Sequence, residues 1–358
     1  MHHASNRNEA APEPATALMS SFLAQLNERI SRSDLSDATI ASVSCLTLLE
    51  HLRGNDKLSE LHAGGLAEMV RLRGGLYTIQ RARRAKIVRA DIVRSVDNLK
   101  VPLLGRLAND FPPSGPHSST APVHSENTIA KLSRAGMSTD LITILCSLSS
   151  VCQNLEIAWA GASNLDATAY YEDVLCLNHD LLSLEAKSSF NEVLRISILN
   201  FTQPLFRYCA FGQRSCRLRS TRLKLLIEKI DTRSLDDGLL LWIMLNGYMT
   251  SYRTSLRPWY RTRLAAIMRD RGIPPQAAWE QVKAHLQRFL WTDSIHDPIG
   301  KQFYDSLEQS DDAFTFQDPC RSCGGSLHNF GSTPSPTPPS KDLLTSSPKD
   351  SAYCQMDP

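Results

Sequence analysis

The sequence predicts an all-α protein. Apolar side chains recur at helical spacing along most of the chain, and no segment alternates apolar and polar residues as a half-buried strand does. There is no strand–helix–strand rhythm and no repeat of fixed period, so we expect a helical array of roughly 10–13 helices. With 358 residues, 42% of them hydrophobic, the chain is long enough for one large domain or two ordinary ones with a sizeable core.

The most specific pattern lies between Asp56 and Leu99. In its first part, apolar side chains fall on one helical face. Gly74-Gly75 then provides a C-terminal cap in the left-handed backbone conformation, which ends this helix. The residues of that face are Leu58, Leu61, Leu66, Met69 and Val70. A second helix, from roughly Gln80 to Asn98, ends before Pro102. The stretch is therefore predicted to form a helical hairpin, with Asp56 as its N-terminal cap.

Two charged residues occupy apolar positions of this hairpin. Arg73 continues the apolar face of the first helix, and Asp91 lies between apolar residues of the second. A half-buried charge without a partner is strongly destabilising, so we expect Arg73 and Asp91 to form an ion pair across the hairpin. In the alternative interpretation, both side chains extend to solvent along their apolar stems.

Further helices are predicted on both sides of the hairpin by the same periodicity. Residues 239–249 are apolar nearly all round, as expected of a central helix surrounded by others, and Ser138 is the expected N-cap of the helix that follows it. The predicted helices outside the hairpin cover approximately residues 16–30, 40–50, 137–159, 170–181, 190–201, 218–230, 239–249, 258–271, 275–290 and 298–307.

These helices define one predicted domain over residues 15–310. Residues 1–14 are polar, and in the C-terminal segment 311–358 proline, serine and threonine dominate, so both ends are predicted to be disordered. The proline-rich segment 111–126 is expected to be a surface loop between two helical halves.

Charge and cysteine usage narrow the class of protein. Lys and Arg number 39 against 37 Asp and Glu, so the net charge of +2 gives no global attraction to nucleic acid or anionic membranes. The nine cysteines lack the spacing of a disulfide framework and are expected to be reduced, mostly buried thiols. No signal peptide and no run of about 18 apolar residues occurs, so we expect an intracellular protein without a membrane segment.

Acidic motifs were compared with those of terpene cyclases, which hold magnesium against a diphosphate. The segment Asn55-Asp56-Lys57-Leu58-Ser59 begins like one such motif, but Ala63 stands where a glutamate is required. Asp236-Asp237 and Asp311-Asp312 both lack the acidic residue that should follow. No nucleotide-binding, serine-hydrolase or zinc-protease motif occurs either. We therefore expect no enzyme activity, no catalytic residue and no cofactor.

One cysteine pair has the spacing of zinc ligands. Cys320 and Cys323 form a C-x-x-C motif, with His328 and Cys354 downstream as additional ligands. Because a structural zinc site normally takes two such pairs, this pair in a proline-rich tail is only a weak metal candidate.

Basic and aromatic clusters have two interpretations each. The basic segments 81–86 and 217–224 suit a nuclear import signal or a phosphate-binding patch, but solvated helix faces with ion pairs inside the domain are the favoured interpretation. Four tryptophans are expected to be core residues rather than a ligand box. They are Trp242, Trp259, Trp279 and Trp291.

Two groups of motifs carry a family resemblance. The first consists of His62, Gly65-Leu66, Met69-Val70 and Arg73-Gly74-Gly75-Leu76, followed by Arg89-Ala90-Asp91. The second consists of Leu241-Trp242, Arg257-Pro258-Trp259-Tyr260 and residues 279–291. In this order, the motifs resemble the fungal-specific transcription factor domain of zinc-cluster regulators. The resemblance covers roughly residues 40–308.

The resemblance implies an all-helical regulatory region, nuclear localisation and transcriptional control. Members of the family usually carry an N-terminal zinc binuclear cluster of six cysteines, which binds DNA. Here only Cys45 precedes Cys146, so sequence-specific DNA binding by this chain is doubtful. We expect a regulatory protein that acts in the nucleus, or in cytoplasm and nucleus, through other regulators or coregulators, as a homo- or heterodimer or as a metabolite sensor.

Two alternatives remain at this point. The first is a DNA-binding zinc-cluster regulator whose zinc-cluster exon is missing upstream of Met1. The second, more remote, is a helical enzyme such as a terpene cyclase.

Overall fold

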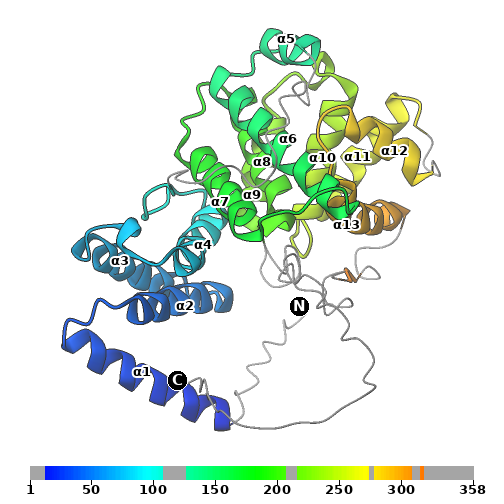
Figure 1. Ribbon diagram of the computed structural model, residues 1–358. Coiled ribbons are helices and arrows are strands. Elements are labelled where there is room, and N and C mark those ends of the chain that lie inside the picture. The colour runs from blue at the N-terminus through cyan, green and yellow to red at the C-terminus, as the bar shows by residue number, and fades with distance from the viewer. Residues whose placement is uncertain (1–12, 108–125, 207–215, 274–277, 309–314, 318–358) are drawn as a thin grey trace, which may run out of the picture.

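The computed structural model describes residues 13–107, 126–206, 216–273, 278–308 and 315–317. Within these ranges the chain forms 13 α-helices, three short 3-10 helices and no strand, which confirms the all-α prediction. The four N-terminal helices lie on one side of a larger group formed by the remaining helices (Figure 1). A single apolar cluster, extending from Leu26 to Tyr304, runs through both groups.

The N-terminal group consists of α1 (Glu13–Ser31), α2 (Asp37–Arg53), α3 (Asp56–Leu72) and α4 (Arg81–Asn98), with a 3-10 helix at Leu76–Thr78. Both α3 and α4 pack on α2 rather than on each other. The predicted hairpin is therefore wrong as a packing unit, although both of its helices are present. Each helix finds its apolar partner in α2, which precedes the pair in sequence.

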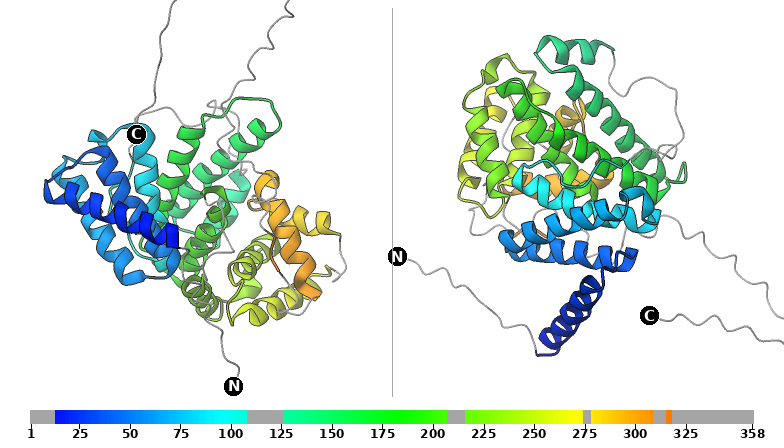
Figure 2. Two further views of the ribbon diagram at one scale, coloured as in Figure 1. Left: turned by 90° about the horizontal axis from the view of Figure 1, so that it is seen from below. Right: turned by 90° about the vertical axis from the view of Figure 1, so that its left-hand side faces the viewer.

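Helix α1 extends away from the rest of the protein (Figure 2). It begins two residues before the predicted boundary of the domain, and its first turn accommodates Pro14, as the first turn of a helix can. Of Leu18, Leu26 and Ile30, which share one helical face at a spacing of four or eight residues, only Leu26 is buried. Periodicity therefore identified the helix, but the described residues leave most of its apolar face uncovered.

Helix α3 buries only part of the predicted apolar face. Leu66 and Val70 are buried against the core, whereas Leu58 and Leu61 are exposed. At its start, Asn55 rather than Asp56 occupies the N-cap position, and Asp56 is the first helical residue. The predicted glycine end is confirmed, because Gly74 and Gly75 have φ values of 99° and 101°.

Helix α4 is the central helix of the molecule. It packs on α2 from its own group and on α7 and α9 from the larger group. Between Ile87 and Asp97 every side chain except Arg89 is buried, including those of charged residues. This helix therefore joins the two groups and places its polar side chains inside the protein.

The larger group surrounds two helices that are buried on all sides, α8 and α10. The burial of α10 confirms the prediction from its continuous apolar segment. The helices of this group are α5 (Glu126–Arg134), α6 (Thr139–Trp159), α7 (Ala167–Ser183), α8 (Ser189–Phe206), α9 (Arg217–Ile227), α10 (Asp237–Thr250), α11 (Arg257–Asp270), α12 (Trp279–Gln287) and α13 (Asp293–Asp305). The other two 3-10 helices are Thr232–Ser234 and Ser306–Glu308.

Helix α6 is long and apolar enough to cross a membrane by length and composition, and it is the one such helix in the described ranges. Half of its most apolar window is buried inside the protein, against α5, α7, α8 and α13, as in a core helix. Ser138 caps it as predicted, accepting a hydrogen bond from the backbone N–H of Leu141 at 3.4 Å.

Several predictions concern residues outside the described ranges. These are most of the predicted disordered segments 1–14 and 311–358, nearly all of the loop 111–126, the helix start at Pro274-Pro275, and the pairs Asp311-Asp312 and Cys320 with Cys323.

Candidate functional site

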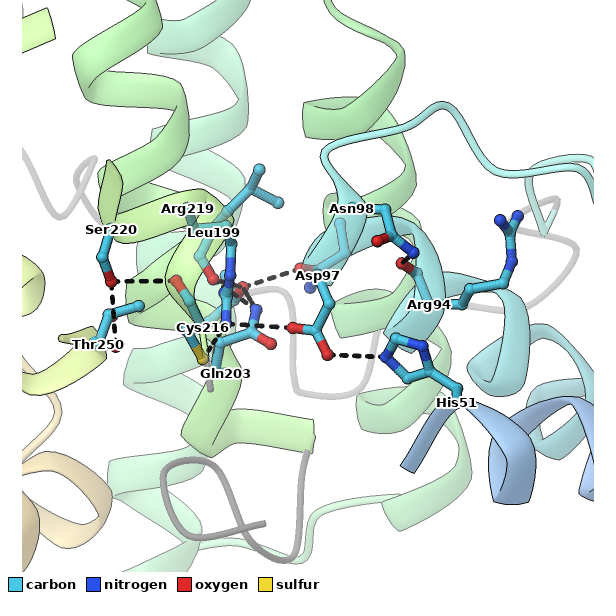
Figure 3. Close-up of polar contacts among 12 residues, drawn as sticks. His51, Arg94, Asp97, Asn98, Leu199, Gln203, Cys216, Arg219, Ser220 and Thr250 are labelled. Carbon is cyan, nitrogen blue, oxygen red and sulfur yellow. Dashed lines mark hydrogen bonds and ion pairs between the residues drawn. The ribbon is translucent and has the colours of Figure 1, made fainter. Parts of the chain in front are cut away.

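A buried polar network joins α4 to helices on both sides (Figure 3). His51 of α2 donates a hydrogen bond from Nε2 to Oδ2 of Asp97 at 2.8 Å. On the other side, Arg219 of α9 pairs with Oδ1 of the same carboxylate at 3.3 Å, and its Nη2 also lies 2.8 Å from Sγ of Cys216. A carboxylate held between two basic side chains avoids the free-energy penalty of an isolated buried charge. The network thereby links α2, α4 and α9.

A second buried ion pair lies one helical turn earlier on α4. Arg94 donates from Nη2 to Oδ1 of Asp91 at 2.8 Å, and both side chains are almost completely buried. The other oxygen of this carboxylate accepts the backbone N–H of Leu104 at 2.7 Å. Asp91 is therefore buried and paired, as expected, but its partner comes from its own helix.

The predicted ion pair between Arg73 and Asp91 is wrong. Arg73 follows the end of α3, beside the start of α2, where it pairs with Asp37. The same guanidinium donates to the carbonyl oxygens of Leu35 at 2.6 Å and Thr78 at 3.1 Å. Since α3 and α4 pack on α2 instead of on each other, the two predicted partners meet different neighbours.

A pocket of about 520 Å³ lies between α2, α4 and the start of α7. Its walls include Ala41, Ser44, Cys45 and Leu48 of α2 and Ala82 and Ala85 of α4. These positions recur at intervals of three and four, so each set shares one helical face, and mostly small side chains leave space between the helices. The volume lies within the range of about 300–1,000 Å³ that is usual for small-molecule sites.

The polar side of the pocket is cationic. Lys86 and Arg89, one helical turn apart on α4, both line it, and none of the described lining residues carries a carboxylate. Nearby, Arg81 binds both carboxylate oxygens of Glu172 on α7, at 2.6 Å and 3.2 Å. That acid is therefore engaged by a third cation of α4.

Two tyrosines of α7 form another wall of the pocket. The hydroxyl of Tyr170 donates to the carbonyl of Leu205 at 3.2 Å, and that of Tyr171 donates to the carbonyl of Phe206 at 2.8 Å. Burial raises the pKa of Tyr170 well above its usual value, so this phenol stays neutral. Because both hydroxyls are bonded to α8, the tyrosines add ring carbon rather than charge to the wall.

The described cysteines form no disulfide, in agreement with the expectation of reduced thiols. Burial raises the pKa of Cys152 and of Cys176 to about 12, so both stay protonated and unreactive at neutral pH. Cys45, in contrast, is exposed and lines the pocket. This thiol was predicted only as one of a set of mostly buried cysteines.

Each of the two basic clusters, on α4 and α9, has an arginine in an ion pair inside the domain. In the first, Arg81 is paired with Glu172 while Lys86 lines the pocket. In the second, Arg219 is buried against Asp97. The favoured interpretation, ion pairs inside the domain, is confirmed for these two arginines.

The acidic segments that resemble cyclase motifs in part make structural contacts within the described ranges. Asp236 caps α10 by accepting backbone N–H groups of its first turn, and Asp237 pairs with Arg271. Ser59 is buried and donates to the carbonyl of Thr47 at 2.9 Å. Across the described ranges, no three His, Cys, Asp or Glu side chains are grouped as a metal site would require.

The tryptophans are mainly core residues, as predicted. Trp242 is fully buried, and Trp279 and Trp291 are buried with their ring centroids 5.9 Å apart. Trp259 is only partly buried, and the ammonium group of Lys224 lies 5.0 Å from its ring centroid.

Three leucines of α3 face solvent. Leu58, Leu61 and Leu72 are 48%, 69% and 57% exposed. Their spacing of three and eleven residues places them within about 60° of one another around the helix axis, so they share one helix face. We call these three residues the α3 leucine row.

Sequence reasoning missed both the pocket and the network around Asp97. The only available signal for the pocket was the recurrence of alanine, serine and cysteine on one face of each of two helices, in segments 41–48 and 82–90. For the network, the signal was a histidine and an aspartate at positions that helical periodicity assigns to the core.

Comparisons with known proteins add no relative. No model of a protein family, no curated protein and no solved structure matches this chain. The resemblance to the fungal-specific transcription factor domain therefore stays a prediction.

Proposed function

We propose that this chain is a regulatory protein of the transcription-factor type that acts in the nucleus through contacts with other regulators or coregulators. In this proposal it has no enzyme activity, no cofactor and no DNA-binding region of its own. The motifs that resemble the fungal-specific transcription factor domain suggest the role. They lie on α4, α10 and α11 and on α3 and α12 with the residues that directly follow these two helices, and their side chains make mainly structural contacts.

The α3 leucine row is the observation that carries the proposal. Isolated exposed leucines need no explanation, but a row on one helix face provides apolar area for a partner. An amphipathic helix is the partner that fits, because its apolar stripe can lie along a helix face that presents leucines to solvent. The flanking acids Glu60 and Glu68 are exposed, but each is paired with a cation of this chain, so they set no charge preference for the partner.

A tethered reporter assay tests the regulatory role. The full chain is fused to an unrelated DNA-binding domain, and transcription from a reporter with the matching site is measured together with the cellular location. We expect nuclear accumulation and a change in reporter output. Exclusive cytosolic residence with unchanged output would overturn the proposal.

Variants of the leucine row test the surface. Leu58→Ser combined with Leu61→Ser should abolish most of the reporter change without lowering the melting temperature, since both side chains are exposed. Leu218→Ser is the matched control, because Leu218 is 51% exposed but lies on α9. Equal reporter loss in the control would remove the leucine row from the proposal.

Purification from nuclear extract tests the proposed partners and the proposed lack of a DNA-binding region. Transcriptional proteins should co-purify with the captured chain. The chain itself should contain no stoichiometric zinc. It should also carry no DNA once nuclease has removed the DNA bound to the co-purified proteins. Analytical ultracentrifugation of the pure protein shows whether a second copy is the partner, in which case the leucine row variants should shift it to a monomer.

A further inference from the structure

The pocket between α2, α4 and α7 has the features of a ligand site. We propose that it binds a small amphipathic monoanion, an organic carboxylate with an apolar body. This proposal goes beyond the regulatory role and does not depend on it, because the pocket and the α3 leucine row involve different residues.

The walls define the apolar part of the ligand. Small side chains of α2 and α4 and two tyrosine rings of α7 enclose about 520 Å³. The hydroxyls of Tyr170 and Tyr171 are both bonded to carbonyl groups of α8, at 3.2 Å and 2.8 Å, so these rings offer a ligand mainly apolar contact. An alkyl chain or a small ring system therefore suits the interior better than a sugar or a nucleotide.

The charged side chains define the polar part. Lys86 and Arg89 lie one turn apart on the same face of α4, and the described lining residues include no acid. The ammonium group of Lys86 offers a positive charge at the exposed edge, and the guanidinium of Arg89 adds a second charge on the same face of the helix. A carboxylate at this edge would leave the apolar body inside the pocket.

The start of α7 contributes less than its position suggests. A helix N-terminus attracts anions, but the backbone N–H groups of Thr168 and Ala169 already donate to Oδ1 of Asp166, at 2.9 Å and 3.2 Å. The capping carboxylate also cancels much of the positive end of the helix dipole. Recognition of the anion therefore depends on the α4 cations. Substitutions of these side chains can test it.

The pocket is accessible from solvent, since Cys45, Ala82 and Lys86 all line it and are all exposed. A ligand can therefore enter without unfolding of a helix. It would also cover the Cys45 thiol, which gives a direct measure of occupancy at this place in the fold.

The test uses three probes with the same alkyl chain: decanoate, decanol and decylamine. Binding to the full-length protein is measured by titration calorimetry below the micellar range of each probe. In parallel, maleimide labelling of Cys45 is followed by peptide mass spectrometry. We expect decanoate to bind one molecule per chain and to slow labelling at Cys45, and decylamine to do neither.

Substitutions then locate the charge preference. Lys86→Met should weaken decanoate binding by about fivefold, as for loss of a partly solvated ion pair, and Arg89→Met by more. Arg83→Met is the matched control, because Arg83 is exposed on the same helix but does not line the pocket, and it should leave binding unchanged.

The outcomes that overturn the proposal are distinct from failure of the regulatory role. Unchanged Cys45 labelling with decanoate, equal binding of decylamine, or equal effects of Lys86→Met and Arg83→Met would each refute it. Slow labelling of the buried Cys152 throughout shows that the probe has not unfolded the protein. The leucine row variants should bind decanoate normally, whatever the reporter assay shows.

Discussion

Asp97 of α4 and Arg219 of α9 form an ion pair of 3.3 Å inside the protein, where their side chains are 6% and 1% exposed. Helix α4 also packs on α2, and α9 packs on α8 and α10. The pair therefore lies at the contact between the N-terminal helices and the rest of the molecule. His51 adds a hydrogen bond to the same carboxylate, so this contact combines apolar packing with a specific polar arrangement.

Substitution Asp97→Asn should reduce the free energy of unfolding by about 3–5 kcal/mol, because it leaves the buried guanidinium of Arg219 without its counter-charge. Urea denaturation followed by circular dichroism measures the change. The matched control is Lys100→Met, which breaks the exposed pair between Lys100 and Glu60 and should cost less than about 1 kcal/mol. If the two variants are equally stable, the Asp97 network has no special role in the fold.

A double-mutant cycle distinguishes the observed partner of Arg73 from the one predicted by sequence. Arg73→Met and Asp37→Asn should show a coupling free energy of about 0.5–3 kcal/mol, as expected for directly contacting residues. Arg73→Met and Asp91→Asn should be additive within about 0.5 kcal/mol, since their ion-pair partners are different. Urea denaturation supplies all of these values. A coupling free energy between Arg73 and Asp91, with none between Arg73 and Asp37, would support the ion pair predicted from the sequence and contradict the observed one.

Glycine at position 247 is required by a neighbouring ring. A Cβ atom there would overlap the side chain of Tyr260, whose Cδ1 would be only 2.9 Å away. The ring is buried and its hydroxyl donates to the carbonyl of Ser220 at 2.8 Å, so it cannot easily move. Gly247→Ala should therefore destabilise the protein by about 1–3 kcal/mol, although alanine is the better helix former.

The matched control for this prediction is Gly65→Ala in α3. A Cβ at Gly65 meets no atom within 4 Å and the backbone is helical, so the substitution should stabilise the protein by about 0.5–1 kcal/mol. Thermal unfolding of both variants measures the opposite signs. If both substitutions stabilise the protein, the Tyr260 ring does not restrict position 247.

The helices themselves were predictable because their apolar residues repeat at a regular interval. Helix α10 is the clearest case, since a segment that is apolar on all sides can only be buried on all sides. Helix α4 was harder to interpret, because the charged residues Asp91, Arg94 and Asp97 interrupt its apolar pattern. All three are buried, since their charges are neutralised by partners within the protein.

Which face of a helix meets which neighbour was not predictable from one sequence. In α3, Leu58 and Leu61 belong to one apolar stripe and Leu66 and Val70 to an overlapping one, and only the position of α2 decides which is covered. The pocket depends in the same way on three helices that are distant in sequence. Small side chains in each helix are compatible with close packing as well as with a cavity.

A buried histidine predicts how stability depends on pH. His296 is fully buried, its ring lies 4.0 Å from that of Phe201, and its Nε2 donates to the carbonyl of Phe201 at 3.0 Å. Burial lowers the pKa of His296 to about 4, and this effect outweighs the opposite influence of Asp297 and Asp293. The unfolded chain, with a histidine pKa near 6.5, therefore binds the proton more readily than the folded protein does.

The stabilising contribution of neutral His296 is thus fully present above about pH 7 and is lost as the pH falls toward the folded pKa of about 4. Between about pH 7.5 and pH 5 the loss should be on the order of 2 kcal/mol. His296→Gln keeps an N–H donor but cannot take up a proton, so its free energy of unfolding should fall less over this range. Urea denaturation at several pH values measures both proteins, and the difference between them cancels the carboxylates that titrate near pH 5. Parallel pH profiles would mean that His296 is accessible to protons in the folded protein.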